Sequence, residues 1–592
     1  MSFDPTRLRA ARDHARKTLL AARNAEGHWS GELSSSALAT ATAVNALRIV
    51  QQETGADHQA LIDGGLRWLA EHANDDGGWG DTVKSLSNIS TTTLCWAVFT
   101  EGAEFREVVK RAEAWLAKKA GGISAEQLVP AIIRRYGKDR TFSVPILTHC
   151  ALAGKVGWER VLQLPFELAA FPQTWFAALR LPVVSYALPA LIAIGQARHV
   201  HRPTLNPITR ILRSVTREKT LSVLENIQPS NGGFLEATPL TSFVTMSLAG
   251  SGMANHPVVA RGVEFLKQSV RQDGSWPIDT NLSTWVTTLS INALGDSVRD
   301  LLPENERDKI RGWLLAQQYR EVHPFTNAAP GGWAWTDLPG GVPDADDTPG
   351  ALLALKFLGG NCQEAARLGV GWLLDLQNRD GGMPTFCRGW TNLPFDRSGP
   401  DLTAHAMRAW RAWHGDLPDL RGRIDAAHAR AARFLANSDG PHGWAPLWFG
   451  NQHAPGEINW TYGTAKVAAA LNDPPQLALP GGALRQRAAR NCLLHLQHED
   501  GAWGGFKDGP SSIEETALAL EALAGSGNEE GDDHAAVQSA RARGMDWLLD
   551  QVESGAWLEP SPIGFYFAKL WYYERLYPLI FTVGALERVA AD

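Results

Sequence analysis

The chain has 592 residues, which exceeds one ordinary domain and predicts two to four. Apolar residues make up 44% and charged residues 20%, so the chain can build large cores and is not disordered. The net charge is −7 and no basic stretch is present, so no nucleic-acid partner is expected. Tryptophan is unusually common, with 23 residues against 20 Phe and 8 Tyr. Because its ring needs burial and its N–H a partner, this excess predicts a repeated structural or chemical use.

The first 24 residues are charged and amphipathic, and they lack the apolar core of a secretory signal. The cysteines stand singly, without a CxxC pair, which indicates neither a zinc cluster nor a disulfide framework. We interpret them as small core residues in a reducing compartment. They are Cys95, Cys150, Cys362, Cys387 and Cys492. We expect no metal ion and no cofactor.

The longest apolar stretch runs from Leu181 to Ile194 and carries two prolines. It is too short to span a membrane, which takes roughly 20 apolar residues. Two interpretations stay open. The stretch is either a buried helix or loop, or a monotopic patch that enters one leaflet of a bilayer.

A repeated pattern extends over the chain. Two copies keep the spacing Gln-x3-Gly-x-Trp, and a third replaces the tryptophan by methionine. These copies are Gln497, Gly501 and Trp503; Gln551, Gly555 and Trp557; and Gln377, Gly381 and Met383. Looser copies end at Trp29, Trp79, Trp276, Trp333 and Trp444. From residue 276 onward, successive copies end 50 to 61 residues apart, a length that fits two helices and their connections.

Each copy joins an apolar stretch of helical periodicity, such as WLLDLQ, to a glycine-containing turn that ends in tryptophan. We expect the tryptophan to fold back on the helix end and the glutamine to bond a neighbouring helix terminus. No strand of credible length is visible. The pattern therefore predicts an all-α fold of helical hairpins, which close into α/α toroids, or α/α barrels.

These copies resemble the QW repeats of triterpene cyclases, the squalene–hopene and oxidosqualene cyclases. The resemblance covers nearly the whole chain, best after about residue 225, and identifies it as a divergent member. It implies two α/α-barrel domains. Residues 1–25 and 281–592 would form the catalytic α6–α6 barrel, and residues 26–280 an inserted second barrel with a membrane-facing apolar segment.

Asp344, Asp346 and Asp347 place three carboxyls in four residues, just before a predicted helix start at Pro349. Like-charge repulsion would keep one of them protonated, which makes the cluster a Brønsted acid. An acidic helix cap or a divalent-metal site is the alternative. The DxDD motif resembles the catalytic motif of squalene–hopene cyclases and other class II terpene cyclases. The resemblance implies that Asp346 protonates a terminal alkene, with Asp344 and Asp347 as its anionic supports.

The conjugate base of such an acid needs a hydrogen-bond donor. The segment from Asp401 to His405 resembles the family's DxTAH segment, whose histidine bonds the acidic aspartate. The resemblance therefore implies that His405 is the partner of Asp346.

A protonated polyene becomes a series of carbocations, which aromatic faces stabilise and anions would trap. Resemblance to the family's cavity segments implies this role for several aromatic residues, although core packing is the alternative for each. They are Trp335, Trp285, Trp448, Phe386, Phe565, Tyr566, Tyr573 and Trp175. The family usually has a tyrosine in place of Phe386, and its buried glutamates after the first two repeats are missing here. These differences bear on the product.

The resemblance implies a cofactor-free class II cyclase, an isomerase that converts squalene or a similar polyprene to a polycyclic triterpene. It also implies a monotopic protein on the cytoplasmic face of the cell membrane, and a homodimer is left open. One alternative is a class II cyclase of a prenyl diphosphate, for which Arg134–Arg140 could supply positive charge. The other is a non-catalytic α/α toroid that binds a lipid or a partner. A prenyltransferase subunit would need Asp, Cys and His zinc ligands, and no such set is found.

Overall fold

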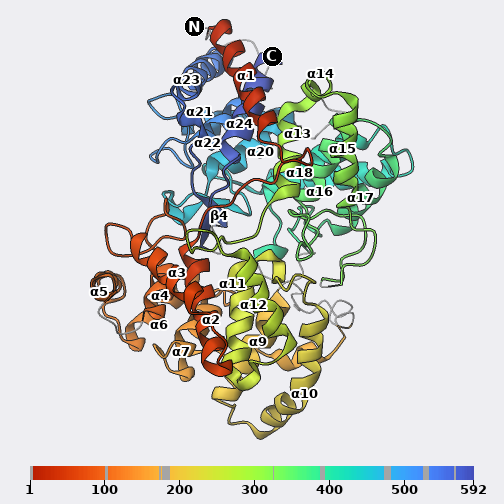
Figure 1. Ribbon diagram of the computed structural model, residues 1–592. Coiled ribbons are helices and arrows are strands. Elements are labelled where there is room, and N and C mark those ends of the chain that lie inside the picture. Colours follow the sequence, from red (N-terminus) through yellow and green to blue (C-terminus); the bar gives the residue numbers. More distant parts are fainter. Residues whose placement is uncertain are drawn as a thin grey trace.

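The computed structural model describes residues 4–99, 104–172, 175, 187–324, 326–386, 394–472, 482–524, 532–565 and 569–591. The described residues are predominantly helical, and Figure 1 shows the helices gathered in two lobes. The upper lobe holds α1 and the helices from α13 to α24, and the lower lobe holds the helices from α2 to α12. Both ends of the chain lie at the top of the upper lobe.

The inner helices of the upper lobe form a closed ring, because each packs against the next and α24 packs against α13. In ring order they are α13 (Ser283–Leu294), α16 (Asp347–Leu358), α18 (Pro400–Trp413), α20 (Trp460–Asn472), α22 (Ile513–Ala524) and α24 (Tyr577–Ala591). Each is almost entirely buried where described, since it faces the ring centre on one side and an outer helix on the other. This confirms the toroid predicted for this part of the chain.

A second layer of helices surrounds this ring. The outer helices are α1 (Pro5–Ala21), α15 (Glu304–Ala316), α17 (Gln363–Leu376), α19 (Arg421–Asn437), α21 (Gly482–Leu496) and α23 (Asp532–Ser554), with the short α14 (Val298–Leu301) beside α16. The amino-terminal helix α1 packs against α24 and α23, far from it in sequence. The outer layer of the upper lobe therefore includes the first described helix of the chain.

The lower lobe is a second ring, in which α11 closes against α2. Its inner helices are α2 (Ala37–Thr54), α4 (Ile89–Val98), α7 (Ser143–Leu152), α9 (Leu188–His201) and α11 (Thr238–Leu248). Its outer helices are α3 (Gln59–Glu71), α5 (Arg106–Ala120), α6 (Ala125–Tyr136), α10 (Pro207–Asn226) and α12 (Pro257–Ser269). The all-α fold with two α/α toroids is thus confirmed.

The repeat turns are held by the contacts that their sequence predicts, as the turn at Trp503 illustrates. The indole Nε1 of Trp503 donates to the carbonyl of Leu493, 2.8 Å away at the end of the preceding outer helix. Its backbone N–H donates to Oγ1 of Thr516, 2.9 Å away on the next inner helix. The same pair of bonds recurs at Trp29, Trp79, Trp276, Trp333 and Trp444. Each turn therefore ties an outer helix to an inner one.

The repeat glutamines connect neighbouring units. Nε2 of Gln497 donates both to the carbonyl of Gly501 in its own turn and to the carbonyl of Ala540 on the next outer helix. Gln228, Gln318 and Gln377 make equivalent pairs of bonds. The predicted contact of the glutamine with a neighbouring helix is confirmed at these positions.

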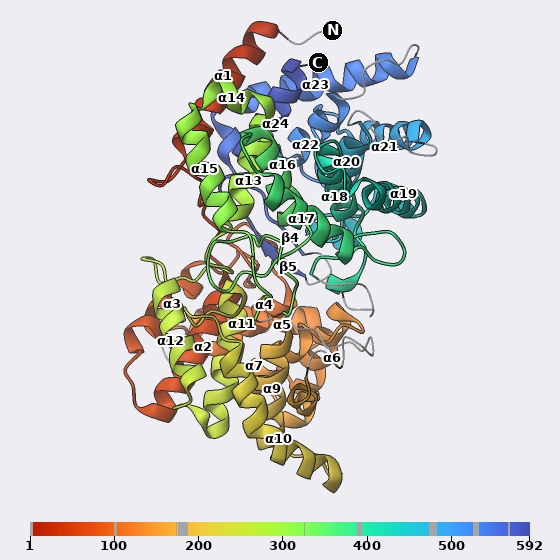
Figure 2. The same ribbon diagram turned by 90° about the vertical axis from the view of Figure 1, so that its right-hand side faces the viewer.

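Short strands, which the sequence analysis does not predict, are also present, and Figure 2 shows β4 (Ile563–Phe565) and β5 (Leu570–Tyr572) between the lobes. In the described residues, β3 (Phe449–Gly450), β4 (Ile563–Phe565) and β5 (Leu570–Tyr572) form an antiparallel sheet, and β1 (Asp439–Gly440) pairs with β2 (Gly443–Trp444). Strands of two or three residues show no alternation that a sequence pattern could reveal. The β4–β5 hairpin brings the carboxy-terminal segment between the two rings.

Candidate active site

The acid motif lies at the start of α16. The Asp344 Oδ1 atom accepts hydrogen bonds from the backbone N–H groups of Asp346 and Asp347, each 2.8 Å away, which fixes the turn that leads into the helix. Asp344 and Asp347 are 3% and 4% exposed. The Asp346 side chain remains 19% exposed. The motif thus buries two carboxyls and leaves the third accessible to a reactant.

Burial decides the charge of the two buried carboxyls. It raises the pKa of Asp344 to about 7. Burial raises the pKa of Asp347 well above its usual range, and the charge of Asp344 raises it further. Because Asp344 is stabilised by two N–H donors, the pair holds its proton on Asp347. The two buried carboxyls therefore differ in how strongly each holds a proton, and the sequence expectation that both support Asp346 as anions stays a prediction.

His405 contacts the accessible carboxyl, as the sequence analysis expects. Its Nδ1 atom lies 2.6 Å from Oδ1 of Asp346, and it comes from α18, the neighbouring helix of the ring. Burial lowers the pKa of His405, so the ring is neutral near pH 7 and can donate its Nδ1–H to an oxygen of the Asp346 side chain. Asp401, one turn earlier on α18, accepts from the N–H of Leu447 at 2.9 Å. Burial raises the pKa of Asp401 to about 7, and the negative charge of Asp346 adds to the effect.

Aromatic side chains form a continuous collar beside this acid. The collar comprises Trp285, Trp335, Phe386, Trp448, Phe565, Tyr572 and Tyr577. Ring centroids of its neighbours lie 4.3 Å apart at Trp448 and Phe565 and 6.3 Å apart at Trp335 and Phe386. The Trp285 backbone N–H donates to the Trp335 carbonyl, which closes the circuit. The collar can present a series of π faces to a bound molecule.

Two tryptophans connect the collar to the acid: Trp285 contacts His405 directly, and Trp448 reaches the acid motif through Thr385. The Trp285 ring lies edge-on to the His405 ring, with centroids 6.4 Å apart. The Trp285 Nε1 atom donates to the Tyr577 hydroxyl at 2.9 Å, which fixes the indole. Trp448 is fixed in the same way, since its Nε1 atom donates to Thr385 Oγ1 at 2.7 Å. The Thr385 carbonyl also accepts from the backbone of Ala345, within the acid motif.

Three of the aromatic residues named from the sequence are not seen in the collar. Trp175 is 59% exposed in the lower lobe, stacked on Phe171. Tyr573 lies outside the collar, beneath the ammonium group of Lys84 at 5.6 Å. Tyr566 is outside the described residues. The sequence analysis also missed Tyr572, Tyr577 and Phe395, whose ring is 5.5 Å from that of Trp448.

The described residues contain no group of three or more His, Cys, Asp or Glu side chains that could hold a metal ion. In the same part of the chain, no helix has the length and apolar character needed to cross a membrane.

Comparison with known proteins identifies the family. The profile of the squalene-hopene cyclase C-terminal domain matches residues 282–591, and that of the N-terminal domain matches residues 13–192. A squalene–hopene cyclase of Zymomonas mobilis is 25% identical, over 95% of this chain and 93% of that protein. The enfumafungin synthase efuA of Hormonema carpetanum is also 25% identical over 92% of this chain, which spans only 45% of its length.

Among solved structures, the ent-copalyl diphosphate synthase of Streptomyces platensis has a TM-score of 0.53 at 17% identity, with 99% of each chain covered. This likeness concerns the fold alone. The two domain profiles, by contrast, match most of the sequence. The chain belongs to the squalene–hopene cyclase family of class II terpene cyclases.

Proposed function

We propose that the protein cyclises squalene or a related linear polyprene to a polycyclic triterpene, with Asp346 as the acid. The observation that carries the proposal is the 2.6 Å contact between Asp346 and the neutral His405, beside the aromatic collar. The name of the Zymomonas relative, a squalene–hopene cyclase, supports squalene as the first substrate to test.

In the proposed reaction, the Asp346 O–H bond breaks and its proton forms a C–H bond with a terminal alkene carbon. The Nδ1–H of His405 stabilises the carboxylate that remains. The positive charge moves along the polyene as successive C–C bonds form, with the collar shielding it from water. Loss of a proton or addition of water ends the cascade. Asp346 then regains a proton from solvent before the next turnover.

The test is turnover of detergent-dispersed squalene, with products identified by mass spectrometry and NMR. We expect Asp346→Asn to abolish cyclisation, because the amide cannot supply the proton, while the thermal unfolding midpoint stays near that of the wild type. His405→Phe should reduce turnover by about 100-fold or more, as for loss of one preorganised donor. An active Asp346→Asn variant, or a wild-type protein that cyclises no polyprene, would contradict the proposal.

The same proposal places the protein on the surface of a membrane, and the outer helix α10 supports this. Ile208, Ile211, Leu212 and Val215 follow one helical stripe, and Ile208 and Val215 are 78% and 70% exposed. Such an exposed apolar stripe is typical of a helix that lies in a bilayer interface. Phe171 and Trp175 are also exposed apolar residues of this lobe. In contrast, Leu188 and Ile194 of the expected apolar segment are buried in α9.

Sedimentation with anionic lipid vesicles tests this placement. We expect the variant with Ile208→Ser, Ile211→Ser and Val215→Ser to bind vesicles at least about tenfold more weakly, because each serine removes apolar area from the interface. Val322→Ser, at a residue 58% exposed in the upper lobe, is the matched control. Equal binding by all three proteins would exclude α10 as the membrane contact. Light scattering of the same proteins without vesicles measures their mass and so tests the homodimer that the sequence analysis leaves open.

The proposal also retains the domain division 1–25 with 281–592 and 26–280. The packing of α1 on α24 supports the first pairing. The same proposal assigns the protein to the cytoplasmic face of the cell membrane, and this assignment rests on the family resemblance.

A further inference from the structure

Lys466 of α20 is a cation inside the upper ring. Its Nζ atom lies 5.3 Å from the ring centroid of Tyr462, one turn earlier on the same helix, and 5.7 Å from that of Phe581. Phe581 belongs to α24, which does not stand next to α20 in the ring order. A side chain of α20 that reaches an aromatic ring on α24 must point toward the centre of the toroid. Lys466 therefore places a positive charge in the ring interior.

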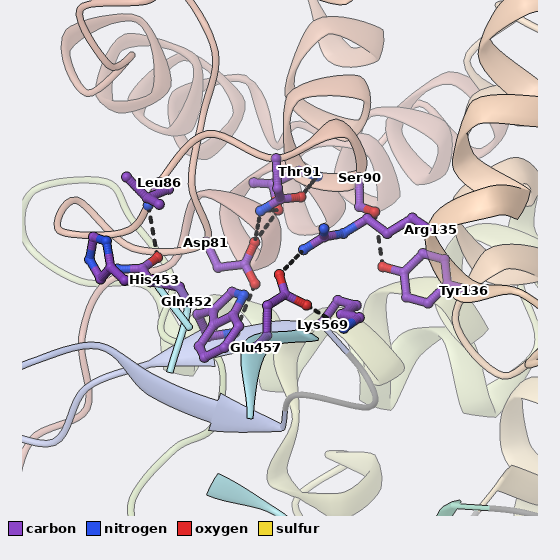
Figure 3. A network of polar contacts seen from close by, with 12 residues as sticks. Asp81, Leu86, Ser90, Thr91, Arg135, Tyr136, Gln452, His453, Glu457 and Lys569 are labelled. Carbon is purple, nitrogen blue, oxygen red and sulfur yellow. Dashed lines mark hydrogen bonds and ion pairs between the residues drawn. The ribbon is translucent and has the colours of Figure 1, made fainter. Parts of the chain in front are cut away.

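Enclosed cations in proteins normally contact a carboxylate. At the junction of the two lobes, for example, Arg135 and Lys569 both pair with Glu457 and approach it from opposite sides (Figure 3). In the described part of the chain, by contrast, Lys466 forms no ion pair and no hydrogen bond. Instead it lies over two aromatic faces, which attract an ammonium group. Because a protein interior screens charge less than water does, this unpaired charge acts on groups beyond contact distance.

The charged groups that face Lys466 include the acid itself. They are Glu521 of α22, Asp346 of the acid motif, and Arg408 and Asp401 of α18. Burial lowers the pKa of Lys466, and the negative charges of the three carboxyl groups oppose this effect. The ammonium group is thus within electrostatic reach of Asp346 without contacting it.

The histidine beside the acid responds to the same charge. Burial lowers the pKa of His405, the hydrogen bond to Asp346 raises it, and the positive charge of Lys466 lowers it again. Arg408, on the same helix as His405, has a smaller effect in the same direction. A neutral His405 leaves the proton of Asp346 available to the alkene, whereas a protonated His405 would hold Asp346 as a carboxylate with no proton to give. The ammonium group therefore favours the protonation state that the proposed reaction needs.

We propose that Lys466 is a positioning residue of the acid, whose ammonium group keeps His405 a neutral donor to Asp346 and stabilises the carboxylate that remains after proton transfer. The inference rests on the proposed function and adds to it a residue outside the acid motif and the collar. No bond to Lys466 forms or breaks, because the ammonium group acts only through its field. The proton still passes from Asp346 to the alkene and returns from solvent.

The pH dependence of squalene turnover tests this inference. We expect Lys466→Met to lower kcat at pH 7 about tenfold with an unchanged KM, because the carboxylate of Asp346 loses a stabilising charge. The acidic limb of the kcat profile should also move upward by about one pH unit. It moves upward because loss of the positive charge raises the pKa of His405, so that His405 becomes protonated at a higher pH.

Two further variants show whether the charge is responsible. Lys466→Arg keeps the positive charge and should retain both the acidic limb and most of kcat. Lys356→Met is the matched control, since this lysine of α16 lies over the Trp413 ring and pairs with Asp416. It should leave the profile unchanged.

A measurement without turnover separates this inference from the proposed function. NMR of isotope-labelled histidine follows the titration of each imidazole ring, and the loss of one signal in His405→Phe identifies His405. We expect Lys466→Met to raise the pKa of His405 by about one unit and Lys466→Arg to leave it unchanged.

An unchanged titration of His405 in Lys466→Met, or an equal shift of the acidic limb in Lys356→Met, would overturn the inference while cyclisation persists. Equal losses of kcat in Lys466→Arg and Lys466→Met would assign Lys466 a purely structural role and also overturn it. A wild type that cyclises no polyprene, or an active Asp346→Asn variant, contradicts the proposed function instead, and the titration of His405 still decides the inference. Thermal unfolding midpoints verify that each variant is folded.

Discussion

Asp344 and Asp347 lie against the start of α16, while Asp346 reaches His405. The motif itself predicted a crowded acid and its histidine partner, because both residues occur in short contiguous segments. Which carboxyl keeps a proton depends on burial and on the two backbone donors to Asp344, and neither is visible in the sequence.

The collar shows the same limit for aromatic residues. The sequence analysis expects Tyr573 to stabilise the cation, whereas in the structure its neighbour Tyr572 is the tyrosine that contacts the collar. One step along an extended segment moves a side chain to the other face, so an uncertainty of one residue in the resemblance decides which tyrosine is expected there. Trp285, Trp335 and Trp448 lie in the collar, and distinctive neighbours fix their positions in the sequence.

At this scale we predict opposite results for two adjacent substitutions. Tyr572→Leu removes an aromatic face and its hydroxyl contact with Tyr577, so it should release incompletely cyclised products and lower turnover about tenfold or more. Tyr573→Leu should leave the product pattern unchanged, since this ring lies against Lys84. Gas chromatography with mass spectrometry measures the product pattern of both variants. A changed product pattern only in Tyr573→Leu would remove Tyr572 from the cation path.

At the scale of the element, the repeat turn is the unit that positions the inner helices. The spacing of Gln, Gly and Trp predicted the turns and the outer helices correctly. The threonine that receives each turn was missed, because it lies on the next inner helix and belongs to a different segment of sequence. Thr516 both accepts from the Trp503 N–H and donates to its carbonyl, at 2.9 and 3.2 Å.

Removal of this hydroxyl should cost stability in a specific way. Thr516→Val keeps the shape but leaves the buried Trp503 N–H without an acceptor, which costs about 1–3 kcal/mol. Thr516→Ser keeps the hydroxyl and should cost about 1 kcal/mol, the value of one buried methyl group. Urea unfolding followed by circular dichroism measures both. If serine destabilises as much as valine, the hydroxyl does not hold the turn.

For the whole molecule, the two rings are predictable from the repeats, but the large stock of buried ionisable groups is not. Burial raises the pKa of several carboxyls: Asp344, Asp401 and Glu574 to about 7, and Glu514 to about 8. Burial lowers the pKa of His149 and His428 to about 3. These shifts arise where segments distant in sequence enclose the same side chain.

They predict that the protein loses stability as pH rises from 7.5 to 8.5. In this range the unfolded carboxyls have already released their protons, whereas the folded ones, Glu514 above all, still hold part of theirs, so the folded state binds more protons. The histidines contribute little slope, because an unfolded histidine has a pKa near 6.5 and is mostly neutral above about pH 7.5. The free energy of unfolding should fall by about 1 kcal/mol.

Differential scanning calorimetry across this pH range measures the effect as a falling Tm. Glu514→Gln is the matched variant, since it removes the group with the highest printed pKa of this set and should flatten the slope above pH 7. A Tm that rises between pH 7.5 and 8.5 would contradict the assignment of these protons.

The packing of α1 on α24 also sets an order of events during synthesis. The residues from Pro5 to Ala21 leave the ribosome long before their partner, which is complete only when translation has passed Ala591. The whole lower ring, whose helices contact one another, can fold while the upper ring still waits for its closing helix. A nascent chain must therefore keep the apolar face of α1 from aggregating until translation of α24 is complete. Truncation before α24 would leave α1 without that partner. It would also leave the acid motif on a ring that cannot close.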